Sequence, residues 1–145
     1  MRRTTTRLAL WIVAPGLAAA LGLLAGAAPA GAHHAFSAEF DADRPLRLEG
    51  TVSKTEWINP HSWIHIDVVG EDGQVVTWAI ECGAPNALMR RGLNKNSVPV
   101  GTELVIEGFG AKNGSSTANA RDITFPDGST FFVGSSGTGA PYERR

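Results

Sequence analysis

Alternation of apolar and polar residues over short runs is the feature that most restricts how this chain can fold. Residues 46–53 alternate leucine, glycine or valine with charged and hydroxyl-bearing residues. A period of two is typical of a strand with one face on a core. The same alternation returns in residues 62–69 and 74–82, and the turn signal Glu-Asp-Gly at residues 71–73 separates them. The pattern therefore predicts antiparallel strands.

The rest of the chain predicts further strands and one helix. The strands are expected over residues 102–109, 119–125 and 129–133. A helix is expected over residues 85–91, because Pro85 suits a first helical turn and Gly92 follows the last. It is so short that it needs Leu88, with Met89 as a second contact, docked on a sheet.

We therefore predict a mainly β fold: a small OB-like antiparallel barrel of five to six strands, with one short helix between strands three and four. An open β-sandwich is the alternative. A fold of this kind hosts many functions, so it restricts function little.

Residues 1–32 have the composition of a secretory signal peptide. Arg2, Arg3 and Arg7 precede an apolar run, and the segment ends in the small residues Ala-Gly-Ala at 30–32. We accordingly expect a periplasmic or secreted protein. The expected organisation is a cleaved signal peptide (1–32), an irregular N-terminal arm (33–45), a barrel domain (46–134) and a flexible tail (135–145).

Composition excludes several classes of protein. The net charge of the whole chain is −1, and it becomes −4 when the three signal arginines are removed. Such an acidic chain has no basic face for nucleic acid. After the signal, no apolar run approaches the roughly 20 residues of a membrane span. The single Cys82 excludes an internal disulfide. Its position predicts a buried thiol, with a metal thiolate or an intermolecular disulfide as the alternatives.

Histidine is the only residue type whose placement suggests chemistry, since the chain has no G-x-S-x-G, C-x-x-C or H-E-x-x-H motif. Cleavage after residue 32 would give His33 a free amine beside its own imidazole and that of His34, a donor set that favours Cu(II). His61 and His65 share one face of a predicted strand, roughly 13 Å apart. At most one of them is therefore expected to join His33 and His34 at one ion.

An aromatic face is the second candidate site. Trp63 lies between the two strand histidines on the polar face, which also carries Asp67, and Trp57 precedes the strand. Trp78, by contrast, shares the parity of the predicted core. A polar-aromatic sheet surface of this kind can bind a ligand or a partner.

Three functions remain open at this point. We favour an exported binding module that holds Cu(II) or another divalent metal through its N-terminal histidines. The alternative is a structural or protein-interaction domain without metal, which docks another exported protein. A copper-dependent oxidative enzyme is more remote. If the protein is a metal-binding module, His33→Ala should abolish metal binding. If it is an interaction domain, the interaction should be sensitive to substitution of Trp63.

Five segments together resemble a family of bacterial exported proteins known as a domain of unknown function. The segments are AHHAFSAEFD at 32–41, EWINPH at 56–61, GAPNALMRRG at 83–92, NGSSTANAR at 113–121 and PDG at 126–128. The resemblance covers residues 32–137 and implies an exported single domain, with no activity attached. Cys82 departs from the family's pattern, which argues against a role as a ligand.

Overall fold

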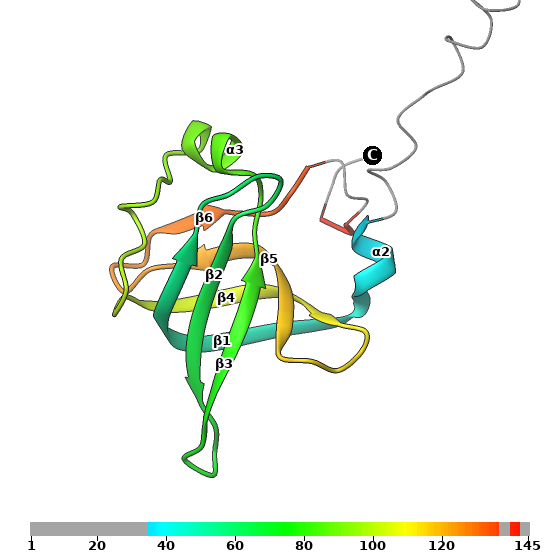
Figure 1. Ribbon diagram of the computed structural model, residues 1–145. Coiled ribbons are helices and arrows are strands. Elements are labelled where there is room, and N and C mark those ends of the chain that lie inside the picture. Colours follow the sequence, from blue (N-terminus) through cyan, green and yellow to red (C-terminus); the bar gives the residue numbers. More distant parts are fainter. Residues whose placement is uncertain (1–34, 137–139, 143–145) are drawn as a thin grey trace, which may run out of the picture. The chain divides into compact units, whose positions relative to one another are not determined.

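Strand pairing closes most of the sheet into a ring. The computed structural model describes residues 35–136 and 140–142. Its elements are α2 (Ala35–Glu39), β1 (Phe40–Glu56), β2 (Trp63–Val69), β3 (Val75–Glu81), α3 (Pro85–Arg90), β4 (Glu103–Ala111), β5 (Thr117–Thr124) and β6 (Thr130–Phe132). The six strands lie in the order β3-β2-β1-β4-β5-β6, and a parallel β3–β5 pairing joins five of them into a ring (Figure 1). The expected mainly β, barrel-like fold is confirmed.

A single long strand makes this ring possible. β1 has 17 residues; it pairs with β4 along its first part and with β2 along its last part. The change of partner falls at residues 51–52, next to a register shift between Val52 and Lys54. Gly50 lies so close to β2 that a Cβ there would be 2.7 Å from the Asp67 carbonyl oxygen. The absence of a side chain at Gly50 therefore lets the two strands meet at the bend.

The core lies inside the ring and follows the predicted parity. Inward side chains from four strands, with relative exposures of 0–2%, are those of Ile64, Ile66, Ile80, Ile106 and Ile123. Burial of one such side chain contributes about 1.5–3 kcal/mol. The opposite parity of β2, which carries Trp63, His65 and Asp67, is only half-buried. The outer face of β2 is therefore available for a site.

The first described residues differ from the expected irregular arm. Residues 35–39 form α2, and β1 begins at Phe40 instead of at residue 46. The physical reason is aromatic burial: Phe36 and Phe40 are 3% and 2% exposed. Phe36 meets the Phe109 ring edge-on at a centroid distance of 5.5 Å. These rings form a second apolar cluster with Ala111, outside the main core.

The helix expected between strands three and four is confirmed as α3. Leu88 is 1% exposed and docks in the main core, whereas Met89 is 58% exposed. Arg91, just after the helix, donates from Nη1 to the Gly134 carbonyl oxygen at 2.8 Å. Its guanidinium also lies 4.6 Å from the centre of the Phe132 ring. Arg91 thus attaches the segment after β6 to the end of α3.

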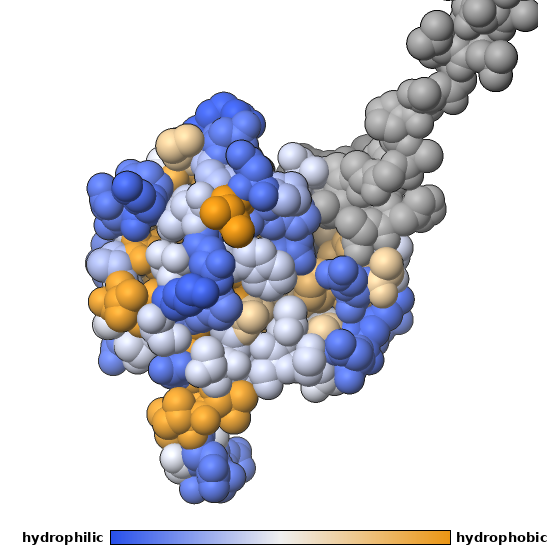
Figure 2. Space-filling model, in the orientation of Figure 1, coloured by the Kyte–Doolittle hydropathy of each residue, from blue (hydrophilic) through white to orange (hydrophobic). Residues whose placement is uncertain are grey.

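The β2–β3 hairpin extends beyond the ring and carries exposed apolar residues. Val69, Val75 and Val76 are exposed at its outer end, and the apolar colour gathers there in Figure 2. β3 pairs with β5 only through residues 79–81, so the outer part of the hairpin packs on little else. No helix in the described ranges combines the length and apolar character needed to cross a membrane.

Candidate functional site

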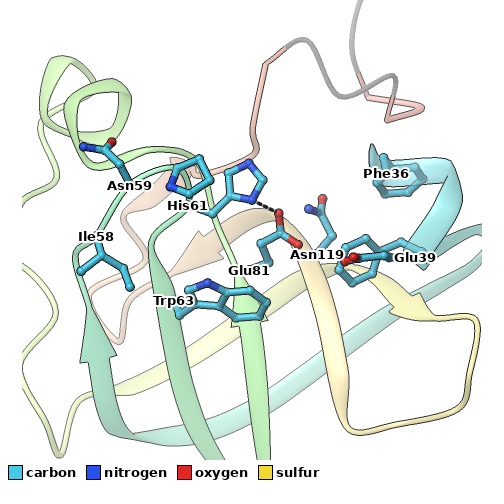
Figure 3. A pocket seen from close by; sticks show the side chains of 10 residues that line it. Phe36, Glu39, Ile58, Asn59, His61, Trp63, Glu81 and Asn119 are labelled. Atoms are coloured by element: carbon cyan, nitrogen blue, oxygen red, sulfur yellow. Dashed lines mark ion pairs between the residues drawn. The ribbon is translucent and has the colours of Figure 1, made fainter. Parts of the chain in front are cut away.

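A pocket of about 290 Å³ lies on the outer face of the sheet, beside α2. Its walls come from α2, the start of β1, the β1–β2 loop and one residue each of β2, β3 and β5. The lining residues are Phe36, Glu39, Phe40, Ile58, Asn59, Pro60, His61, Trp63, Glu81 and Asn119. Figure 3 shows Glu81 between His61 and Asn119, with the Trp63 indole beside it.

Strand register brings the polar residues of the pocket together. Trp63 at the start of β2 pairs with Glu81 at the end of β3. Glu81 in turn pairs with Asn119 in the parallel β3–β5 ladder that closes the ring. The three residues are thus neighbours across three strands, although Trp63 and Asn119 are far apart in the chain. The loop before Trp63, which ends at His61 and Ser62, places the imidazole over the end of β3.

The His61–Glu81 pair is the centre of the pocket. His61 Nδ1 contacts Glu81 Oε1 directly, and Glu81 is only 5% exposed. A carboxylate that holds one ring nitrogen fixes the tautomer and orientation of the imidazole. His61 therefore offers its other nitrogen, Nε2, to a ligand.

Burial and a nearby acid govern the protonation of this pair. Burial raises the pKa of Glu81 to about 7; the negative charge of Glu39 raises it further, and a hydrogen bond from Asn119 opposes both. Burial also lowers the pKa of His61, against the opposing effect of Glu39. Both shifts favour the neutral forms. Once Glu81 ionises, above a pH of about 7, its carboxylate accepts the hydrogen of His61 Nδ1, and Nε2 then carries the lone pair that a ligand needs.

A second histidine–carboxylate pair lies farther along the same face. His65 Nε2 is 2.9 Å from Glu56 Oε1, and Lys54 Nζ is 2.7 Å from the same oxygen. Hydrogen bonds from Lys54 and then His65 lower the pKa of Glu56. His61 and His65 thus have separate carboxylate partners, and of the two only His61 lines the pocket.

The other residues predicted for the site are dispersed. His33 and His34 lie outside the described residues. Trp57 packs against the main core and lines a different pocket, beside Pro85 and α3. Asp67 accepts a hydrogen bond from Thr77 Oγ1 at 2.6 Å, towards the outer end of the hairpin. Of the predicted aromatic face, only Trp63 belongs to the pocket.

Cys82 is fully buried and plays no part in the lining. Its exposure is 0%, and burial, followed by the charge of Glu81, raises the pKa of its thiol far above the usual value. A thiolate is strongly disfavoured in such surroundings. This position agrees with the buried thiol expected from the parity of Cys82.

Sequence reasoning missed Glu39, Glu81 and Asn119. The signal for Glu81 was its parity, since it stands between the inward Ile80 and Cys82 and must point outward. The signal for Glu39 was weaker: its position between Phe36 and Phe40, whose spacing of four is typical of one helix face. Asn119 has no local signal, because only the β3–β5 pairing brings it to Glu81.

The described part of the chain does not hold a metal site by itself. No three His, Cys, Asp or Glu side chains within residues 35–136 and 140–142 are grouped so that they could bind one ion. His61 and Glu39 are the available donors at the pocket. A metal bound there would need further ligands.

Comparison with known proteins identifies a family and nothing more specific. Searches of curated proteins and of solved structures returned no match. A family model described as a family of unknown function, DUF6152, matches residues 19–120. This range includes every residue that lines the pocket. The chain therefore belongs to the family of unknown function DUF6152.

Proposed function

We propose that this protein is an exported binding module that holds a divalent transition-metal ion, preferentially Cu(II), at the pocket beside α2. The ligands are His61 through Nε2 and the two histidines at 33 and 34. The observation that carries the proposal is the contact between His61 Nδ1 and the buried Glu81. Metal-binding histidines almost always have their second nitrogen held by a carboxylate, a backbone carbonyl or a water in this way.

Chain connectivity supports the participation of His33 and His34. Phe36 lines the same pocket as His61, and His33 precedes it by three residues. Three peptide units span at most about 11 Å, so the chain limits how far both histidines can lie from Phe36. Glu39, on the next turn of α2, adds negative charge that attracts a cation.

Export supplies the remaining nitrogen donor. The arginines, the apolar run and the small residues of 1–32 support cleavage after residue 32. His33 would then present its amine and its imidazole to one ion, and His34 and His61 would supply the further nitrogens. Nitrogen donors of this kind favour Cu(II) at the peak of the divalent affinity series.

The test is a Cu(II) titration of metal-free protein that begins at His33. We expect tight 1:1 binding, and calorimetry measures its affinity and stoichiometry. Nitrogen hyperfine structure in the electron paramagnetic resonance spectrum reports the nitrogen ligands. An extra glycine before His33 should weaken binding, because it removes the terminal amine from the chelate. His61→Ala should weaken it too.

His65→Ala is the matched control, because it removes a histidine from the same sheet face but not from the pocket. It should bind Cu(II) as tightly as the unmodified protein. Affinity that is unaffected by both the extra glycine and His61→Ala would overturn the proposal. Equal losses in His61→Ala and His65→Ala would do the same.

One observation favours the alternative, an interaction domain without metal. Val69, Val75 and Val76 expose apolar surface at the end of a hairpin that packs on little else, and such clusters mark interaction sites. Replacement of Val75 by Lys should then abolish association with an exported partner, while Cu(II) binding stays unchanged. If Val75→Lys leaves recovery of every partner from the periplasmic fraction unchanged, the alternative fails.

A further inference from the structure

A chain of polar contacts links the C-terminal segment to the pocket. Tyr142 donates from its hydroxyl to Asn119 Oδ1 at 2.9 Å. The Asn119 side chain lies beside Glu81, its partner in the β3–β5 ladder (Figure 3), and hydrogen-bonds it. Glu81 contacts His61 Nδ1. Asn119 is only 1% exposed, so solvent does not replace its partners.

The Tyr142 ring is held on three sides. It stacks on Phe109 with an interplanar angle of 20° and meets Phe132 nearly edge-on, at 77° and 5.4 Å between centroids. A Cβ added to Gly134 would lie 2.6–2.8 Å from three atoms of the ring and hydroxyl. The Tyr142 ring can therefore occupy this position only because Gly134 has no side chain.

We propose that Tyr142 is a positioning residue of the pocket: its hydroxyl orients the Asn119 carboxamide and, through Glu81, the imidazole of His61. The physical reason is the asymmetry of the carboxamide. With Oδ1 satisfied by the Tyr142 hydroxyl, the NH₂ group faces the Glu81 carboxylate, which accepts it. Without the hydroxyl, the buried Oδ1 has lost its donor, and the orientation of the amide is no longer fixed.

A rotated amide would present its oxygen to Glu81, where two acceptors repel. Glu81 would then change its contact with His61, and the tautomer and orientation of the ring would no longer be fixed. The inference rests on the proposed function only for its effect on Cu(II) affinity. The orientation of His61 in the metal-free protein tests it separately.

The experiment compares the full chain with Tyr142→Phe, which keeps the ring and removes the hydroxyl. In the metal-free protein we expect the ¹⁵N signals of the His61 imidazole to shift towards a mixture of tautomers. In the Cu(II)-loaded protein we expect about a tenfold loss of affinity, the lower end of losses seen when an outer partner of a metal ligand is removed. Gly134→Ala, which displaces the ring, should reproduce both effects.

Two comparisons separate positioning from a structural role. Thr130→Val removes a hydroxyl that makes a 3.0 Å hydrogen bond to Thr124 between β5 and β6, and it should leave the His61 signals unchanged. In an Asn119→Ser background, Tyr142→Phe should have no further effect, because its target is gone. Unchanged His61 signals in Tyr142→Phe, or an equal shift in both backgrounds, would overturn the inference, whatever the outcome for Cu(II).

Discussion

Glu81 carries the largest electrostatic consequence of the residues in the pocket. Burial raises its pKa from an ordinary 4.5 to about 7. Between these values the folded chain keeps a proton that the unfolded chain releases, so the free energy of unfolding falls as the pH rises from 4.5 to 7. The full effect amounts to about 3 kcal/mol. His61 acts in the opposite sense, because its lowered pKa costs stability when the pH falls below its ordinary 6.5.

Glu81→Gln isolates this effect, since it removes the titrating carboxyl and leaves His61 in place. We expect the variant to gain about 3 kcal/mol relative to the original chain as the pH rises from 4.5 to 8. Urea unfolding of the metal-free protein at several pH values measures this difference in the free energy of unfolding. Glu71→Gln, at the exposed hairpin turn, is the control and should follow the original curve. Parallel curves for Glu81→Gln and the original chain would contradict the prediction.

At the scale of elements, α3 depends on its docking. Six residues are too few for an isolated helix in water. Leu88 is 1% and Met89 58% exposed, so the two neighbours form a matched pair. We expect Leu88→Ala to lower the free energy of unfolding by about 3 kcal/mol and Met89→Ala by about 0.5 kcal/mol or less. Urea denaturation measures both losses, and the slope of the unfolding free energy against urea concentration should stay unchanged. Similar losses in the two variants would contradict this account of α3.

The elements also show where local pattern succeeds. Alternation located β2, β3 and β4 to within two residues, because inward and outward side chains are adjacent in the chain. It missed the first part of β1, because residues 40–45 do not alternate like a half-buried strand, and of these only Phe40 and Pro45 are in register with β4. The burial of Phe36 and Phe40 that starts this segment depends on Phe109 and Ala111, which come much later in the chain.

The C-terminal tail shows the same limit of local sequence pattern. Its Gly/Ser-rich composition predicts flexibility over 135–145, and that remains a prediction for the undescribed residues. Within the described part, Ala140 is 3% exposed and Tyr142 contacts Phe109 and Phe132. The contact with Phe109 is made with β4, which is distant in sequence.

At the scale of the whole molecule, Cys82 reports on opening of the domain. It is the only cysteine of the chain and is 0% exposed. We expect iodoacetamide to react only with molecules that have opened, so the native protein should be labelled far more slowly than the same protein in concentrated urea. When reclosing is fast, the rate follows the population of the open form.

Leu88→Ala provides the internal check, because its loss of stability should accelerate labelling by the corresponding factor. Met89→Ala should label at the rate of the original chain. Labelling of the native protein as fast as in concentrated urea would show that the thiol is reachable without opening. Mass spectrometry of the alkylated chain measures all three rates.

The sequence by itself determined most of the strands, the helix α3, the turns and the inward parity of the core, because these depend on neighbours in the chain. It also marked His61 and Trp63 as outward residues on one face. Only the tertiary structure decided that Glu81, Asn119 and Phe36 surround them, and that His65, Trp57 and Asp67 do not line the pocket. The physical reason is closure of the ring: the β3–β5 ladder and the docking of α2 join segments that no local pattern connects.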